Sequence, residues 1–272
     1  MKTIASTLIV STLLAVSVHA HCGRDFIIAE DSHVPQPWDG NILLNYEWEH
    51  QDGPDAFGME SGFMLGILPG VGFGADVGFR DEAEGGWEYS LVRPRVLINL
   101  VPAGTSLPFR AALNLGYQFA NGNDQENASA HADASNSHGH EHHHEAAMEM
   151  PEASEHQHGG VHNHDQDLLA ARLILEADVT DSTRLVFNLI CNLPDGSGPD
   201  WGYAAGIRQR LTQDLAAGVE AIGDFDSEGY HQIVGAVYFT PVSLLTLKLG
   251  AGFGLTEASP DFALHAGLNF RF

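Results

Sequence analysis

The stretch that decides the fold is residues 107–120, which read LPFRAALNLGYQFA. From Leu107 to Phe119 every second residue is apolar, and the residues between them, such as Arg110 and Gln118, are mostly polar or small. A β-strand points successive side chains to opposite faces, whereas an amphipathic helix repeats its apolar residues every three or four positions. The stretch therefore predicts a strand with one apolar face and one polar face.

The same alternation returns along the chain and ends only with the last residue, Phe272. It predicts about twelve strands of an all-β, antiparallel, up-and-down barrel. The predicted strands are 41–49, 58–68, 71–80, 87–100, 107–120, 168–178, 184–193, 201–211, 215–224, 230–240, 244–255 and 262–272. In the fourth of these, the alternation changes parity around Pro94, which predicts a β-bulge there because proline cannot donate a ladder hydrogen bond.

The predicted connections alternate between short turns and longer acidic loops, of which 121–167 is the longest. Segments of about ten residues with alternating hydrophobicity, short turns at one end and long loops at the other are typical of membrane β-barrels. A soluble β-sandwich also alternates, but its outer face is charged. Here the face opposite the apolar one is rich in glycine, for example at Gly72, Gly116, Gly206 and Gly252, which suits a narrow lumen.

The two ends of the chain indicate export. Residues 1–20 have a positive start, an apolar run and a small-residue cleavage site, as in a signal peptide. Leu268, Phe270 and Phe272 resemble the C-terminal recognition signal of Gram-negative outer-membrane barrels, which implies the barrel-assembly machinery and outer-membrane lipid as partners. We therefore expect a signal peptide (1–20), a periplasmic N-terminal segment (21–40) and an outer-membrane barrel (41–272).

Composition and motifs exclude several functions. The net charge of −24 is opposite to what phosphate binding requires, so we expect no nucleic-acid partner. The sequence contains neither a G-x-S-x-G nor an H-E-x-x-H motif, so nothing in it indicates an enzyme.

Charged residues fall on the face that would line the lumen. A charge facing lipid at the bilayer midplane costs about 2–4 kcal/mol for Arg or Lys, so this segregation is what a membrane barrel requires. The alternation predicts these lumen charges: Glu60, Arg80, Arg110, Arg172, Glu176, Arg184, Arg208, Glu220 and Lys248. Glu60 is expected to meet Arg80, and Glu176 to meet Arg184. Such residues fit either a polar pore or an ion-pair network that fills a narrow barrel, and twelve strands lie between the two cases.

The predicted loop 121–167 is acidic and histidine-rich, contains no Lys or Arg, and is expected to be extracellular and disordered without a ligand. Its ten histidines are His131, His138, His140, His142, His143, His144, His156, His158, His162 and His164. Imidazole and carboxylate ligands suit zinc, copper and nickel, and the loop is similar to the His-rich loops of bacterial zinc-uptake components. A pH sensor and a polar loop without specific binding are the alternatives.

Two functional hypotheses follow. The first is a transport-related outer-membrane barrel whose surface loop captures divalent zinc, copper or nickel, bound without a catalytic role. The second is a general or small-solute channel in which the lumen does the work and the loop is incidental.

Overall fold

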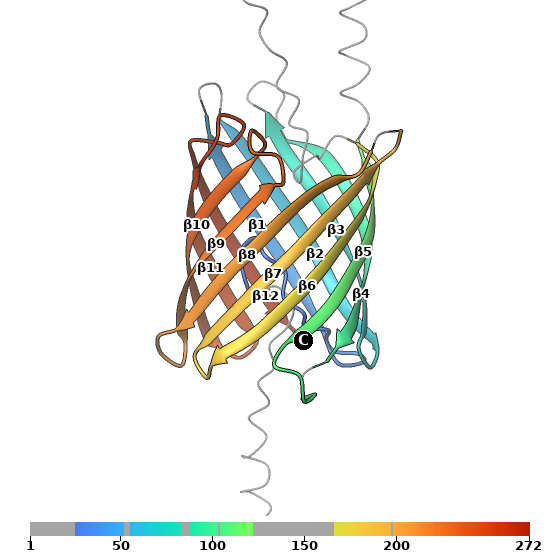
Figure 1. The fold of residues 1–272 in the computed structure, drawn as a ribbon, viewed down its shortest axis with the longest axis vertical. Coiled ribbons are helices and arrows are strands. Elements are labelled where there is room, and N and C mark those ends of the chain that lie inside the picture. The colour runs from blue at the N-terminus through green and yellow to red at the C-terminus, as the bar shows by residue number, and fades with distance from the viewer. Residues whose placement is uncertain (1–24, 52–54, 83–86, 103, 122–165, 197) are drawn as a thin grey trace, which may run out of the picture.

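The computed structural model describes residues 25–51, 55–82, 87–102, 104–121, 166–196 and 198–272. It contains twelve strands, arranged as a barrel in Figure 1. They are β1 (Gly40–His50), β2 (Ala56–Leu68), β3 (Val71–Glu82), β4 (Trp87–Val101), β5 (Arg110–Ala120), β6 (Leu168–Thr180), β7 (Thr183–Pro194), β8 (Asp200–Arg210), β9 (Leu215–Asp224), β10 (His231–Val242), β11 (Leu245–Gly254) and β12 (Phe262–Arg271). No helix in the described part of the chain is long and apolar enough to cross a membrane.

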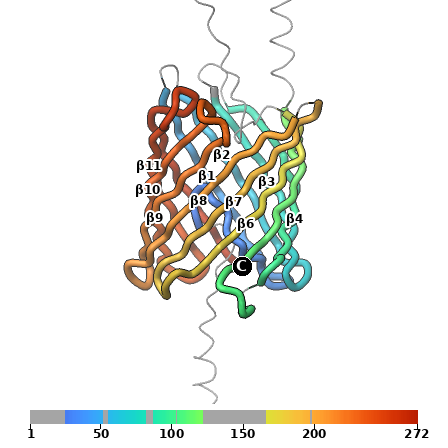
Figure 2. The backbone as a smooth tube through the Cα atoms, in the orientation of Figure 1, coloured from blue at the N-terminus to red at the C-terminus, as the bar shows by residue number. Residues whose placement is uncertain are grey.

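Each strand pairs antiparallel with its neighbours in the sequence, and β1 closes the barrel against β12. The tilt of the strands around the closed wall is visible in Figure 2. Main-chain hydrogen bonds from Gly40 to Phe272 (N to O, 2.9 Å) and from Phe272 to Gly40 (3.0 Å) seal the seam. The all-β, antiparallel, up-and-down barrel of twelve strands predicted from the alternation is thus confirmed. Because all strand edges are paired, the wall has no open edge.

The two ends of the barrel differ. The short β2–β3, β6–β7 and β10–β11 turns lie at the end where β1 begins and β12 ends, which we call the turn end. The opposite end, which we call the loop end, carries the connection between β5 and β6.

The outer surface of the barrel is apolar and the inner surface polar. On β5, Leu115 and Phe119 point outward and are 38% and 50% exposed, while Asn114 and Gln118 point inward and are buried. The other strands repeat this arrangement, with outward-facing aromatic and aliphatic side chains such as Phe187 on β7. An apolar belt around a closed barrel is stable in lipid and not in water, so this surface faces a membrane.

A β-bulge on β4 explains the parity change seen in the sequence. Gly78 of β3 pairs with Leu91, but the next residue, Phe79, pairs with Tyr89, so the extra residue is Ser90. The sequence predicts the bulge around Pro94, and the structure places it four positions earlier, at Ser90. Tyr89 faces outward, and beyond the bulge Leu91 faces inward and is buried.

The N-terminal segment differs from the expectation that residues 21–40 lie in the periplasm outside the barrel. Residues 25–39, which we call the plug, precede β1; residues 25–35 lie inside the lumen, in the turn-end half of the barrel, and the exposed residues near 36–39 lead out to β1. The residues inside the lumen bond to the inner faces of β6, β7 and β9, and the physical reason is complementarity between their backbone groups and the polar wall. Residues 21–24, like the predicted signal peptide (1–20), lie outside the described residues.

Candidate functional site

The candidate site is the lumen at the level of the plug, where wall and plug together leave little space. Plug residues such as Phe26 and Asp31 are almost completely buried. Each of the twelve strands contributes at least one inward side chain that is less than 10% exposed. These are Asn41, Met64, Asp76, Leu97, Ala112, Ile174, Asn188, Ala204, Glu220, Val234, Lys248 and Asn269 on β1 to β12 in order. Burial on every side indicates that the plug and the inward side chains of the wall together fill the lumen.

Glu220 on β9 is the main anchor of the plug. Its carboxylate accepts hydrogen bonds from three successive backbone N–H groups, those of Ile27 (2.8 Å), Ile28 (2.8 Å) and Ala29 (2.9 Å). The hydroxyl of Tyr238 donates a further, short hydrogen bond to the same carboxylate. Successive N–H groups that converge on one anion form a backbone nest, which stabilises a negative charge that is buried from water.

Two further wall residues bind the plug backbone. The side-chain amide of Asn188 on β7 accepts from the N–H of Glu30 (2.7 Å) and donates to its carbonyl (2.8 Å). Glu176 on β6 accepts from both the N–H (2.9 Å) and the hydroxyl (2.7 Å) of Ser32. The polar wall therefore compensates backbone groups that a plug in an apolar lumen would leave unpaired.

Basic residues of the wall hold the start of the plug. The carboxylate of Asp25 lies 2.9 Å from Arg184, 2.9 Å from Arg208 and 3.6 Å from Arg271. Lys248 donates to the carbonyl of Phe26 (2.6 Å). Asp25 is buried, and charge-assisted bonds to several arginines are what make a buried carboxylate tolerable.

A second plug carboxylate, Asp31, accepts from the N–H groups of Asp25 (2.6 Å) and His33 (3.1 Å). Burial, reinforced by the negative charges of Asp25 and Glu176, raises the pKa of Asp31 to about 6. A carboxyl group whose pKa rises on docking favours the docked state while it is protonated. Docking of the plug therefore weakens as the pH rises from the group's ordinary value of 3.8 towards 6.

Glycines in the wall make room for the plug. A Cβ atom at Gly206 on β8 would lie 2.9 Å from the ring of Phe26, and one at Gly66 on β2 would lie 2.1 Å from the carbonyl oxygen of Gln36. Gly66 also exchanges backbone hydrogen bonds with Trp38 and Asp39. The glycine-rich face predicted from the sequence thus accommodates the plug backbone and the Phe26 ring.

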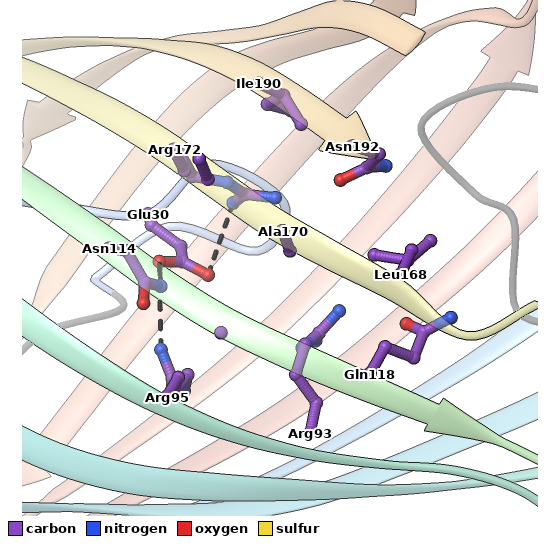
Figure 3. Close-up of a pocket in the computed structure, with 12 residues that line it drawn as sticks. Glu30, Arg93, Arg95, Asn114, Gln118, Leu168, Ala170, Arg172, Ile190 and Asn192 are labelled. Atoms are coloured by element: carbon purple, nitrogen blue, oxygen red, sulfur yellow. Dashed lines mark hydrogen bonds and ion pairs between the residues drawn. The ribbon is translucent and has the colours of Figure 1, made fainter. Parts of the chain in front are cut away.

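The side chain of Glu30 points towards the loop end of the plug, into a partly open cavity lined by residues of β4 to β7. Its carboxylate lies 3.3 Å from Arg172 and 3.7 Å from Arg95, and it accepts a hydrogen bond from Asn114 (2.5 Å). In Figure 3, Arg172 and Arg95 approach Glu30 from different sides.

The predicted lumen charges lie on the inner face. Arg184 is 3.1 Å from Glu176, as the sequence predicts, and Arg110 also reaches Glu176 (2.7 Å). Glu60 lies 3.0 Å from Arg93, and Arg80 lies 3.7 Å from Glu49, while the expected Glu60–Arg80 pair stays a prediction. The bulge on β4 turns Arg93 into the lumen, where it reaches Glu60. The remaining predicted charges, Arg172, Arg208, Glu220 and Lys248, all contact the plug.

The predicted metal ligands cannot be placed. All ten loop histidines, from His131 to His164, lie outside the described residues. Within the ranges that the structure describes, no group of three or more His, Cys, Asp or Glu side chains could hold a metal ion.

Sequence reasoning missed the plug residues, above all Asp25, Glu30 and Ser32. A signal was present, because an apolar run, Phe26 to Ala29, is flanked on both sides by acids. The acids of this segment pair with wall arginines, and its Phe26 ring packs against Gly206. These wall residues come from strands far apart in the sequence, so the sequence alone does not show that they surround one segment.

No family model and no curated protein matches this sequence. Its structure is similar to that of a KdgM porin, with a TM-score of 0.53 and 10% sequence identity over 85% of this chain and 99% of the other. It is also similar to the COG4313 outer-membrane channel from Pseudomonas putida F1, with a TM-score of 0.53 and 9% identity over 89% and 98% of the two chains.

The barrel has the fold of Gram-negative outer-membrane porins and channels. A NanC porin shares it as well, with a TM-score of 0.51 and 7% identity over 84% of this chain and 100% of the other. At these identities the likeness establishes the fold. Together with the apolar belt, it identifies the chain as an outer-membrane β-barrel.

Proposed function

We propose that the protein is an outer-membrane channel for small solutes whose lumen is closed, in the described state, by its own N-terminal plug. The observation that carries the proposal is that a separate segment, outside all twelve strands, fills a lumen whose wall is polar. Glu220, Glu176 and Asn188 bind the plug through its backbone. Once the plug leaves, water can hydrate the same groups, so the barrel does not need the plug to satisfy its wall.

The alternative is that the plug is a permanent filling. An apolar cluster that includes Phe26, Ala29 and Val34 contributes to its retention. However, the wall near this cluster also carries charged groups such as Arg184, Arg208 and Lys248, which water can hydrate when the plug is absent. The structural neighbours are named as porins and a channel, which also favours solute passage over a filled barrel.

Liposome swelling tests the proposal. Vesicles that contain the full-length protein are compared with vesicles that contain a variant without residues 25–36, in iso-osmotic sugars of increasing size. We expect small sugars to enter through the variant faster than through the wild type, and the rate to fall with sugar size. If the correctly folded variant admits no sugar, the lumen is not a channel and the proposal is wrong.

A second proposal concerns the segment 121–167. Its ten histidines and ten carboxylates, without Lys or Arg, support capture of divalent zinc, copper or nickel. This proposal rests on composition alone and is independent of the channel. If no metal binds, the segment is a polar loop without specific binding.

A further inference from the structure

Glu30 is held in the lumen by two separate sets of wall residues. Its backbone and its side chain have separate partners: Asn188 binds the backbone N–H and carbonyl, whereas Arg172, Arg95 and Asn114 contact the carboxylate. Asn188 therefore holds the backbone of Glu30 independently of the carboxylate. Its two oxygens face different donors, Oε1 towards Arg172 and Oε2 towards Arg95 and Asn114.

Those donors are arranged as a receptor for a carboxylate. Arginine guanidinium groups and side-chain amides are preferred partners of carboxylates in proteins. Arg95 is buried, and Asp76 on the neighbouring strand β3 holds its Nε at 2.9 Å, which orients the guanidinium while Nη1 faces Glu30. Arg95, at the centre of the site, is thus positioned by the wall independently of Glu30.

The space beside Glu30 continues towards the loop end. Among the described residues that line it, three are arginines and the one acid is Glu30 itself. Beyond the carboxylate, Arg93, Gln118 and Asn192 supply polar groups, and Leu168 and Ile190 an apolar side (Figure 3). A solute that enters from the loop end therefore meets this cavity before it meets the plug.

We propose that Arg172, Arg95 and Asn114 form a binding site for the carboxylate of an anionic solute, and that Glu30 occupies this site as an internal substitute. This inference rests on the proposed channel function and names the class of solute it admits. Binding of the solute displaces the Glu30 side chain, while the anchor at Asn188 is unaffected. Removing the negative charge of Glu30 then leaves the site available for the solute.

The test is equilibrium binding of glucuronate and, for comparison, glucose to the purified full-length protein, measured by titration calorimetry. The two sugars differ in the carboxylate. We expect Glu30→Gln to bind glucuronate about tenfold more tightly than the wild type, because the internal competitor has lost its charge, and to bind glucose no more tightly. The matched control is Glu228→Gln, an exposed glutamate in the β9–β10 loop, which should bind glucuronate as the wild type does.

Adding Arg172→Gln to Glu30→Gln should weaken glucuronate binding at least tenfold, and Arg172→Lys should recover part of it. The inference is overturned if Glu30→Gln binds glucuronate no more tightly than the wild type, binds both sugars alike, or is insensitive to Arg172. Failure of the channel itself would appear separately, in the swelling of vesicles with the variant that lacks residues 25–36.

Discussion

Ala29 and Glu220 are 191 residues apart in the sequence, yet the backbone N–H of Ala29 donates a hydrogen bond of 2.9 Å to the Glu220 carboxylate inside the lumen. With the N–H groups of Ile27 and Ile28, this contact joins the first described residues of the chain to β9. The N-terminal segment and the barrel wall therefore form one structure, and the state of the lumen depends on this attachment.

Replacing Glu220 with alanine should loosen the plug. Three backbone N–H groups would lose their acceptor, and a buried polar group without a partner costs about 1–3 kcal/mol. We expect the amides of residues 27–29 to exchange with deuterium at least tenfold faster, as measured by mass spectrometry. Glu228→Ala in the β9–β10 loop is the control. Equal protection of these amides in wild type and Glu220→Ala would contradict the anchoring role.

Replacing Gly206 with a larger residue should destabilise the protein, because the new side chain would clash with the plug. A Cβ at this position meets the ring of Phe26 at 2.9 Å, so Gly206→Val should reduce thermal stability by about 1–3 kcal/mol through overpacking. Gly235 on β10 is the matched control, because an added Cβ there meets nothing within 4 Å. Thermal unfolding of both variants decides the matter; an equal loss of stability would mean that contact with Phe26 is not the cause.

Arg184 should contribute to stability through several carboxylates at once. It lies 2.9 Å from Asp25 and 3.1 Å from Glu176, and Arg184→Leu should cost about 2 kcal/mol as a lost charge-assisted interaction. Adding Glu176→Gln should recover part of this loss, because it removes the enclosed Glu176 carboxylate that has lost its contact with Arg184. A double-mutant cycle from thermal unfolding measures the coupling. Strictly additive effects would show that Arg184 and Glu176 do not interact.

The metal hypothesis makes an independent prediction. A variant without residues 131–164 should retain the barrel, since no strand is removed, and should lose most zinc binding in calorimetric titration. Binding to the full-length protein should also weaken below about pH 6.5, because only neutral imidazole binds a metal. If both proteins bind zinc equally, or neither binds it below millimolar concentration, metal capture is not the function of this segment.

Much of the fold was predictable because it depends on local alternation. Leu115 and Gln118 on β5 face lipid and lumen because adjacent side chains of a strand point to opposite faces, whatever the rest of the chain does. The bulge was predictable as a parity change but not as a position. It falls at Ser90 although proline follows at Pro94, since the extra residue is fixed by pairing with β3.

The candidate site was only half predictable. Alternation placed Glu220 and Arg172 in the lumen, but it gave no partner for either, because their partners lie in a segment without periodicity. Ile27 and Glu30 reach them through contacts between residues far apart in the sequence. Alternation also does not show whether a polar lumen is filled by its own side chains or by a separate segment.

The most direct test of the central claim, that the plug closes a channel, is conductance in planar lipid bilayers. Single-channel recordings compare the full-length protein with the variant that lacks residues 25–36, under identical salt and voltage. The account predicts long closed periods for the full-length protein, and a stable conductance several-fold larger for the variant. Equal conductance of the two proteins, or none from a variant shown to be folded and inserted, would contradict it.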